Sequence, residues 1–227
     1  AILGLDDEII EEVCQSIDDI VVPANFNCPG QVVISGTVEG VDEAMRRLQE
    51  KGAKRTIKLM VGGAFHSPLM DPAKQELQRA IEELGGIRLE SYDGGPHGFC
   101  QLEKATPDIG EAIKGATMIM VVVPSSAHVD IATALAPHLV DDQWVVLHPG
   151  RTGGAIEFCK VLRDVRCEAR VKVAEAETFI YASRSEGPAN ARIFRIKNAV
   201  PLAALPATDT TEALEMLHPA YLEFIDG

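Results

Sequence analysis

The chain has 227 residues, of which 46% are hydrophobic, and a formal net charge of -13 at pH 7. This length predicts one large core or two modest cores. The acidic balance argues against nucleic acid and anionic membranes as partners, because both are bound through clustered lysine and arginine. The five scattered cysteines form no CxxC pair and favour a reducing cytoplasm over a disulfide framework or a zinc cluster. Apolar runs are far shorter than the roughly 20 residues of a membrane-spanning helix.

The first sixty residues alternate between the periodicities of strands and helices. The expected elements are, in chain order, a strand from Ala1 to Leu5, a helix with the apolar face Ile9, Ile10, Val13 and Ile17, strands from Ile20 to Asn25 and from Gln31 to Gly36, a helix from Val41 to Lys51 and a strand from Arg55 to Val61. A turn from Asn27 to Gly30 separates the middle strands, and Gly52 ends the second helix. The order βαββαβ predicts a ferredoxin-like unit.

An amphipathic connector helix is expected from Asp71 to Leu84, before the glycine pair at 85 and 86. Its expected inward face consists of Leu77, Ala80, Ile81 and Leu84. We expect the domain boundary at these glycines, with a first domain at residues 1–84 and a second at residues 85–227. The second domain would open with a hairpin of Ile87 to Ser91 and Phe99 to Lys104 around the turn at 93–96.

Helical segments and wholly apolar strands alternate after this hairpin, which is typical of parallel strands covered by helices on both faces. The expected elements are a helix from Thr106 to Lys114, a strand from Met118 to Val123, a helix from Ser125 to Leu139, a strand from Trp144 to Leu147, a helix from Ala155 to Arg163, a strand from Val171 to Ala174, a strand region from Ala191 to Val200 and a helix from Thr210 to Phe224. The pattern predicts an α/β fold with a truncated, Rossmann-like, doubly wound parallel sheet.

The segments from Val22 to Gly36 and from Gly63 to Met70, which reads GAFHSPLM, resemble the malonyl-CoA:acyl-carrier-protein transacylase family. The resemblance covers about residues 1–84 and implies acyl transfer from malonyl-CoA in fatty acid biosynthesis. It implies that His66 is the general base that takes a proton from a nucleophilic serine. The sequence holds no GxSxG elbow for such a serine, so another chain or segment would have to supply it. Alternatively, His66 is an ordinary loop histidine.

A second group of motifs, from Gly86 to Gly227, resembles the octopine and nopaline type of opine dehydrogenases. The motifs are IKGA at 113–116, IMVVVPSSAH at 119–128, HPGRTGGA at 148–155, AEAET at 174–178 and IKNAVP at 196–201. The resemblance implies reduction of an imine, formed between a keto acid and an amino acid, with NAD or NADP as the cofactor. It thus implies a nucleotide and a small-molecule substrate as partners.

Ligands of open α/β sheets lie outside the carboxyl ends of the strands. The candidate cofactor-binding residues therefore follow two of the expected strands: Val123, Pro124, Ser125, His128, Pro149, Gly150, Arg151, Thr152 and Gly153. Glycines let the backbone approach a phosphate or ribose, and amides at a helix start favour an anionic or polar group. Alternatively, the glycines serve only the geometry of a strand-to-helix turn. His128 is the candidate polar contact to a nicotinamide, or else a solvent-facing residue at a helix start.

Parts of the dehydrogenase pattern are missing from this sequence. No GxGxxG or GxGxxA fingerprint precedes the second domain, and Gly94 to Gly98 is no substitute, because Pro96 lacks an amide donor and no helix follows directly. We also expect the helical substrate domain that the resemblance implies to be missing. The affinity for NAD or NADP is therefore expected to be weakened. The histidines lack ligand-like spacing, so no metal is expected.

Three functions remain open at this stage. The first is an NAD(P)-dependent oxidoreductase of opine dehydrogenase type by ancestry, catalytically incomplete. The second is a malonyl-CoA:acyl-carrier-protein acyltransferase fragment with His66 as base and an acyl carrier protein as partner. The third is a non-catalytic chimera of natural or engineered origin. Homo-oligomerisation is also expected, because a missing first βαβ unit would leave an unpaired sheet edge.

Overall fold

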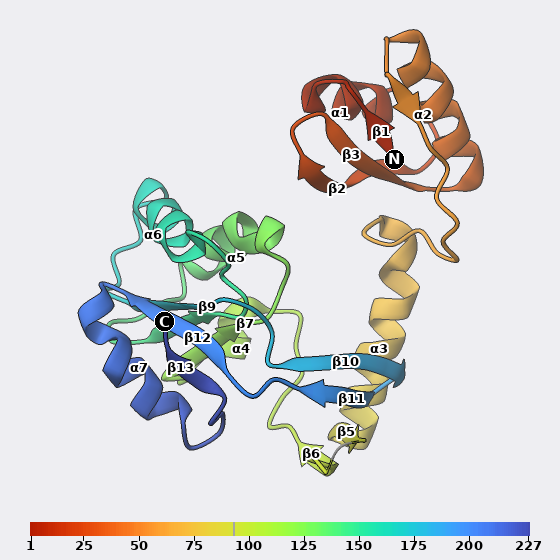
Figure 1. Cartoon of the computed structure of the whole chain (residues 1–227). Coiled ribbons are helices and arrows are strands. Elements are labelled where there is room, and N and C mark those ends of the chain that lie inside the picture. The colour runs from red at the N-terminus through yellow and green to blue at the C-terminus, as the bar shows by residue number, and fades with distance from the viewer. Residues whose placement is uncertain (93) are drawn as a thin grey trace. The chain divides into compact units, whose positions relative to one another are not determined.

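Two units make up the chain in the computed structural model, which describes residues 1–92 and 94–227. Unit 1 is Ala1–Leu77 and unit 2 is Gln78–Gly227 (Figure 1). The division falls within helix α3 (Asp71–Leu84). The boundary expected from the sequence lies at the C-terminal end of that same helix.

Unit 1 has the element order βαββαβ. Its elements are β1 (Ile2–Leu3), α1 (Asp7–Gln15), β2 (Val21–Cys28), β3 (Gln31–Gly36), α2 (Val38–Glu50) and β4 (Arg55–Thr56). The sheet order is β2-β3-β1-β4, and each neighbouring pair is antiparallel, with Ile2 opposite both Val32 and Thr56. This order confirms the ferredoxin-like arrangement that the sequence predicted.

The core of unit 1 lies between the sheet and the two helices. α1 contributes Ile10 and Val13, and α2 contributes Ala44 and Leu48, at the three- and four-residue spacing that places side chains on one helix face. They pack against sheet residues such as Ile2, which has no exposed surface. The expected apolar face of the first helix is confirmed, with Ile9 and Ile17 partly buried at its margin.

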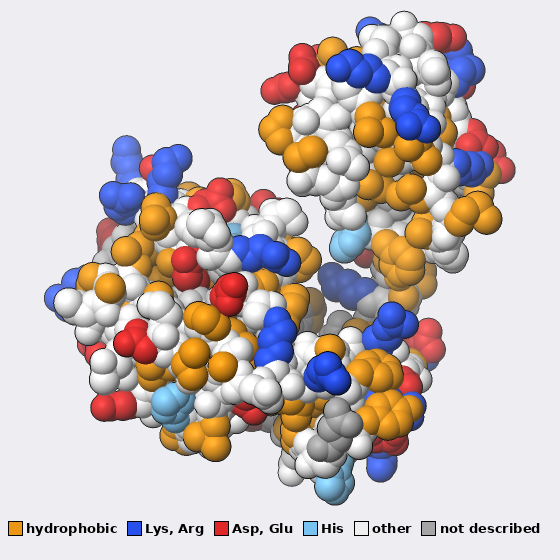
Figure 2. All heavy atoms as spheres, in the orientation of Figure 1, with side chains coloured by type: hydrophobic (Ala, Val, Ile, Leu, Met, Phe, Trp, Pro, Cys, Tyr) orange, Lys and Arg blue, Asp and Glu red, His pale blue; other side chains and the backbone are white. Residues whose placement is uncertain are grey.

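The last strand of unit 1 is shorter than expected. β4 ends at Thr56, whereas the sequence predicted a strand to Val61. Its partner β1 has only two residues, so no strand remains to pair with the chain beyond Ile57. The apolar residues of this segment are exposed instead, and Met60 is fully exposed. Figure 2 shows such apolar side chains gathered on the visible face of unit 1.

Helix α3 has the bounds that the sequence predicted, Asp71–Leu84, and Gly85 follows with a φ of 68°. A positive φ favours glycine at this helix end. The expected inward face is wrong, because α3 has no buried residue and Leu77 and Leu84 are 45% and 52% exposed. An amphipathic pattern thus predicted the helix correctly but not its burial.

Unit 2 contains two sheets and four further α-helices in its described part. The elements are β5 (Gly86–Ser91), β6 (Gly98–Gln101), α4 (Ile109–Ile113), β7 (Met118–Val121), α5 (His128–Leu135), β8 (Trp144–Leu147), α6 (Gly154–Asp164), β9 (Lys172–Ala176), β10 (Tyr181–Gly187), β11 (Asn190–Ile196), β12 (Val200–Leu205), α7 (Thr210–Leu217) and β13 (Phe224–Asp226). Short 3-10 turns at Ser125–Ala127 and Ala207–Asp209 precede α5 and α7.

The larger sheet of unit 2 has the order β13-β12-β9-β8-β7. β7, β8 and β9 are parallel, as predicted, but β12 runs antiparallel to β9, so the sheet is mixed. Successive residues of β8 face opposite layers: Val145 and Leu147 pack with α5 and α6, and Trp144 and Val146 pack with α7. Figure 1 shows α5 and α6 on one side of the sheet and α7 on the other. The α/β class and the two-sided cover are confirmed.

The smaller sheet has the order β10-β11-β5-β6. β5 and β6 pair antiparallel, which confirms the predicted hairpin, although Asp93 in its expected turn lies outside the described residues. The expected strand region from Ala191 to Val200 is wrong as one element, because β11 belongs to this sheet and β12 to the larger one. The helix expected from Thr210 to Phe224 ends at Leu217, and β13 follows. β10 has no counterpart among the expected elements.

Within residues 1–92 and 94–227, none of the helices is long and apolar enough to cross a membrane.

Candidate functional site

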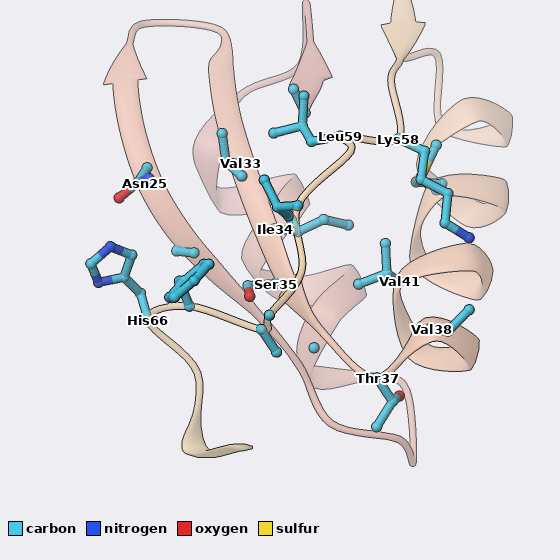
Figure 3. Close-up of a pocket in the computed structure, with 18 of the residues that line it drawn as sticks. Asn25, Val33, Ile34, Ser35, Thr37, Val38, Val41, Lys58, Leu59 and His66 are labelled. Atoms are coloured by element: carbon cyan, nitrogen blue, oxygen red, sulfur yellow. The ribbon is translucent and has the colours of Figure 1, made fainter. Parts of the chain in front are cut away.

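His66 lines a pocket of about 540 Å³ within unit 1. Apolar residues of β3 and α2 make up much of the lining, among them Val33, Ile34 and Val41 (Figure 3). Residues from Ile57 to Leu59 and from Val61 to His66 complete the lining. The pocket is therefore an apolar hollow with a titratable imidazole at its margin.

The backbone at His66 is in the left-handed region, with a φ of 60°, which costs free energy for a residue with a Cβ atom. Next to it, the buried Ser67 hydroxyl donates a hydrogen bond of 2.6 Å to the Ala64 carbonyl oxygen. This bond closes a tight turn that holds the His66 side chain on the surface. Ser67 is thus a structural residue, and no hydrogen bond of the described residues links His66 to a hydroxyl group.

In unit 2, the chain leaves β7 and β8 at the same edge of the larger sheet. Val121 is opposite Leu147 in the parallel pair, and the His148 amide donates a 2.9 Å hydrogen bond to the Val121 carbonyl oxygen. The candidate segments 123–128 and 149–153 therefore both follow the carboxyl ends of parallel strands. This edge is where open α/β sheets bind ligands.

A crevice of about 550 Å³ opens at this edge. Its lining residues are Arg151, Thr152, Glu175, Glu177, Thr178, Lys197, Pro201, Leu202, Ala203 and Gly227. Two of the candidate cofactor-binding residues, Arg151 and Thr152, belong to this set. Val123, Pro124 and Ser125 are outside it, and Gly153 lines a separate hollow between α5 and α6.

The crevice carries charges of both signs and several hydroxyl groups. Arg151 has a φ of 58°, so its backbone is strained. The Lys197 ammonium donates a 2.8 Å hydrogen bond to the Thr178 hydroxyl. Such a lining can form hydrogen bonds with a ribose or an amide group.

Glu175 lines the crevice, but the sequence analysis named it only as part of the AEAET motif at 174–178 and not as a candidate site residue. It lies on β9, and its Oε2 accepts a 2.6 Å hydrogen bond from the Ala155 amide in the first turn of α6. A Cβ atom at Gly150 would lie 2.3 Å from the Glu175 Cβ. Gly150 therefore makes room for this side chain, a contact that depends on the pairing of β8 with β9. Only the position of Glu175 at the end of an apolar strand hinted at such a role.

His128 begins α5 and is completely buried, so the alternative of a solvent-facing side chain is wrong. Among the described residues, neither of its ring nitrogens has a hydrogen-bond partner. Burial lowers the pKa of His128 below 6.5, although Glu157, the Pro149 backbone and Glu175 favour its charged form.

His148 precedes the candidate Pro149 and is also buried. Its Nε2 accepts a 3.1 Å hydrogen bond from the Ile180 amide, and its ring packs edge-on against Phe179 and Phe224. Burial lowers the pKa of His148. The residue thus fixes the loop after β9 rather than facing the crevice, and Pro149 is buried behind it.

Comparison with known proteins assigns the two parts of the chain to different relatives. Residues 1–94 match the family model of the acyl transferase domain. The malonyl CoA-acyl carrier protein transacylase of Bacillus subtilis (strain 168) is 47% identical over 85 residues, which are 36% of this chain and 27% of that protein. The opine dehydrogenase of Arthrobacter sp. (strain 1C) is 34% identical over 147 residues, which are 65% of this chain and 40% of that protein.

The chain joins segments similar to two enzyme families. It spans less than half the length of each of these curated relatives. The match to a solved structure of octopine dehydrogenase with NADH and agmatine covers 67% of this chain and 40% of the octopine dehydrogenase chain. Its TM-score is 0.56 and the sequence identity is 23%. The match to the structure of yersinopine dehydrogenase with NADP+ covers 63% of this chain and 36% of the yersinopine dehydrogenase chain. Its TM-score is 0.52 and the sequence identity is 13%. These likenesses show a Rossmann-like α/β fold.

Proposed function

We propose that unit 2 binds the nicotinamide end of NAD or NADP at the carboxyl edge of β7, β8 and β9, as part of an oxidoreductase of opine dehydrogenase type. The observation that carries this proposal is the polar crevice at that edge, in a segment 34% identical to an opine dehydrogenase. Arg151 and Thr152 line the crevice, Gly150 precedes them, and Gly153 joins them to α6.

The residues fit a nucleoside group that forms hydrogen bonds. The Thr152 and Thr178 hydroxyls can donate to and accept from a ribose or carboxamide, and Lys197 and Arg151 can donate. Pro149 is buried, the segment from Val123 to Ser125 does not line the crevice, and the His128 ring packs against Gly154 at the start of α6. A bound nicotinamide would supply or accept the hydride. The residues of this chain would bind and orient it.

The test is a titration of the purified chain with NADH, followed by nucleotide fluorescence and by quenching of the single tryptophan, Trp144, on β8. Saturable binding that weakens on Thr152→Val is the expected result, because the substitution removes a hydrogen-bonding hydroxyl and keeps the side-chain shape. Ser126→Ala, an exposed hydroxyl outside the crevice lining, serves as the matched control. A folded sample without any NADH or NADPH response at millimolar concentration would contradict the proposal.

A second candidate function rests on unit 1. Its segment is 47% identical to a malonyl CoA-acyl carrier protein transacylase, and His66 stands at the margin of an apolar pocket. In this proposal, His66 is the general base for a serine that another chain or segment supplies, with an acyl carrier protein as acceptor. Malonyl transfer in a mixed assay that is lost on His66→Ala would support it. No transfer with the unaltered chain would count against it.

The third proposal, a non-catalytic chimera of natural or engineered origin, would gain support from a folded chain that neither binds a nicotinamide nucleotide nor transfers an acyl group. We also propose a cytoplasmic location and a homo-oligomeric state. Light scattering at high protein concentration would test the oligomeric state directly, and a monomeric mass would contradict it.

A further inference from the structure

The chain passes between the two sheets of unit 2 through two short links that lie side by side. One link connects β9 to β10, and the other connects β11 to β12. The Lys197 amide donates a 3.0 Å hydrogen bond to the Ile180 carbonyl oxygen. The Glu177 amide donates a 2.9 Å hydrogen bond to the Pro201 carbonyl oxygen, at the start of β12. The backbone therefore holds the two links together without help from their side chains.

One side-chain contact also joins the links, and it lies at the crevice. The Lys197 ammonium donates a 2.8 Å hydrogen bond to the Thr178 hydroxyl, and both residues line the crevice. Thr178 is half-buried, and the chain after it is held by Ile180, whose amide donates to the buried His148 ring. Since the backbone already joins the links, the contact instead fixes the direction of a hydroxyl group in the crevice lining.

The direction of this hydrogen bond decides what the Thr178 hydroxyl offers to a ligand. An ammonium group has three N–H donors and no acceptor, so the Thr178 oxygen must be the acceptor in this contact. The hydroxyl hydrogen remains for another acceptor, and no described residue accepts it. A hydrogen bond from a charged donor also polarises the hydroxyl and makes it a stronger donor. The hydroxyl is therefore set to donate to a ligand in the crevice.

The charges of the crevice favour a neutral acceptor over an anion. Arg151 and Lys197 supply the cationic side chains of the lining, and Glu175 and Glu177 supply the anionic ones. Their formal charges cancel, so these side chains together do not attract a carboxylate or a phosphate. The oxygen of a carboxamide or of a hydroxyl group can accept the hydrogen bond without carrying a charge.

We infer that Lys197 is a positioning residue, which fixes the Thr178 hydroxyl as a donor to a neutral oxygen of the ligand in the crevice. In terms of the proposed function, on which the choice of ligand rests, this oxygen belongs to the carboxamide or the ribose at the nicotinamide end of the cofactor. Lys197 acts on the ligand through Thr178, so removal of either side chain takes away the same interaction.

The experiment measures the affinity for NADH, by nucleotide fluorescence, in the unaltered chain, in Lys197→Met, in Thr178→Val and in the double variant. Each single substitution should weaken binding about tenfold, because a charge-assisted hydrogen bond is lost. The double variant should bind as tightly as either single variant, since the two groups act as one. Lys197→Arg and Thr178→Ser should restore binding. Lys114→Met is the matched control, because Lys114 is exposed and lies outside the crevice lining.

Losses that multiply to about a hundredfold in the double variant would overturn the inference, because Lys197 would then act independently of Thr178. An unchanged affinity in Lys197→Met would overturn it as well, while NADH binding to the unaltered chain would still support the proposed function. A folded, unaltered chain that does not bind NADH would contradict both. If Lys197→Met does not fold, Lys197→Gln, which also removes the charge, takes its place in the same comparison.

Reduced thionicotinamide adenine dinucleotide, which carries sulfur in place of the carboxamide oxygen, distinguishes the two acceptors. If Thr178→Val no longer weakens the binding of this analogue, the hydroxyl donates to the carboxamide. If the loss of affinity persists, the hydroxyl donates to the ribose. Either result supports the inference and identifies the bound oxygen.

Discussion

At the scale of single residues, His148 shows how burial sets the chemistry of a side chain. Its pKa lies below the usual 6.5, because the charged form would lose its solvation. The unfolded chain therefore takes up a proton at a higher pH than the folded chain. The resulting stability is fully present above pH 6.5 and is lost as the pH falls through the lowered pKa of the folded state. His128 shifts in the same direction.

We therefore expect the melting temperature of unit 2 to fall between pH 7 and pH 5, with the His148 ring titrating below pH 6.5. The measurement is a pH titration of the ring signals by NMR, combined with thermal unfolding followed by Trp144 fluorescence. His97→Gln is the control, because His97 is exposed and should leave the pH dependence unchanged. A His148 midpoint at or above pH 6.5 would show that burial does not govern this ring.

At the scale of elements, α2 begins three residues before the start that its apolar periodicity indicates, at Val38 instead of Val41. Thr37 is the cap, and its Oγ1 accepts a 3.0 Å hydrogen bond from the Gly40 amide. Val38 is 61% exposed and Gly40 has no side chain, so neither contributes a side chain to the apolar face of α2 that packs on the core. A helix cap of this kind can be recognised in the sequence only when an amphipathic pattern begins directly after it.

Thr37→Ala should destabilise unit 1 by about 1 kcal/mol, because the Gly40 amide loses its acceptor. Thr37→Ser keeps the hydroxyl and should cost much less. Urea unfolding followed by the Ala44 amide signal in α2 measures both changes. Equal losses for the alanine and serine variants would mean that the methyl group, not the cap, matters.

At the scale of the whole molecule, the chain holds a core in each unit. Leu48 belongs to the core of unit 1, while Trp144 and Leu217 share a core in unit 2. No member of the unit 1 core is shared with those of unit 2. Separate cores of this kind predict unfolding that is not a single two-state transition.

Leu48→Ala should cost about 2–5 kcal/mol in unit 1, because it leaves a cavity in a closely packed core. The midpoint of Trp144 fluorescence should stay unchanged, since Trp144 reports on unit 2. Leu217→Ala should move that midpoint, which makes it the positive control. A shift of the Trp144 midpoint by Leu48→Ala of similar size would show that the two units unfold together.

The sequence by itself determined the presence and order of the helices, the ferredoxin-like order of unit 1, the parallel strands β7 to β9 and the two family resemblances. These depend on periodicity, turn chemistry and motifs, all of which are local along the chain. Only the tertiary structure decided that β12 runs antiparallel, that α3 buries no residue and that Glu175 caps α6. Each of these features depends on which strand or surface lies next to the element in the folded chain. Contacts between residues twenty or more positions apart leave no periodic signal in the sequence.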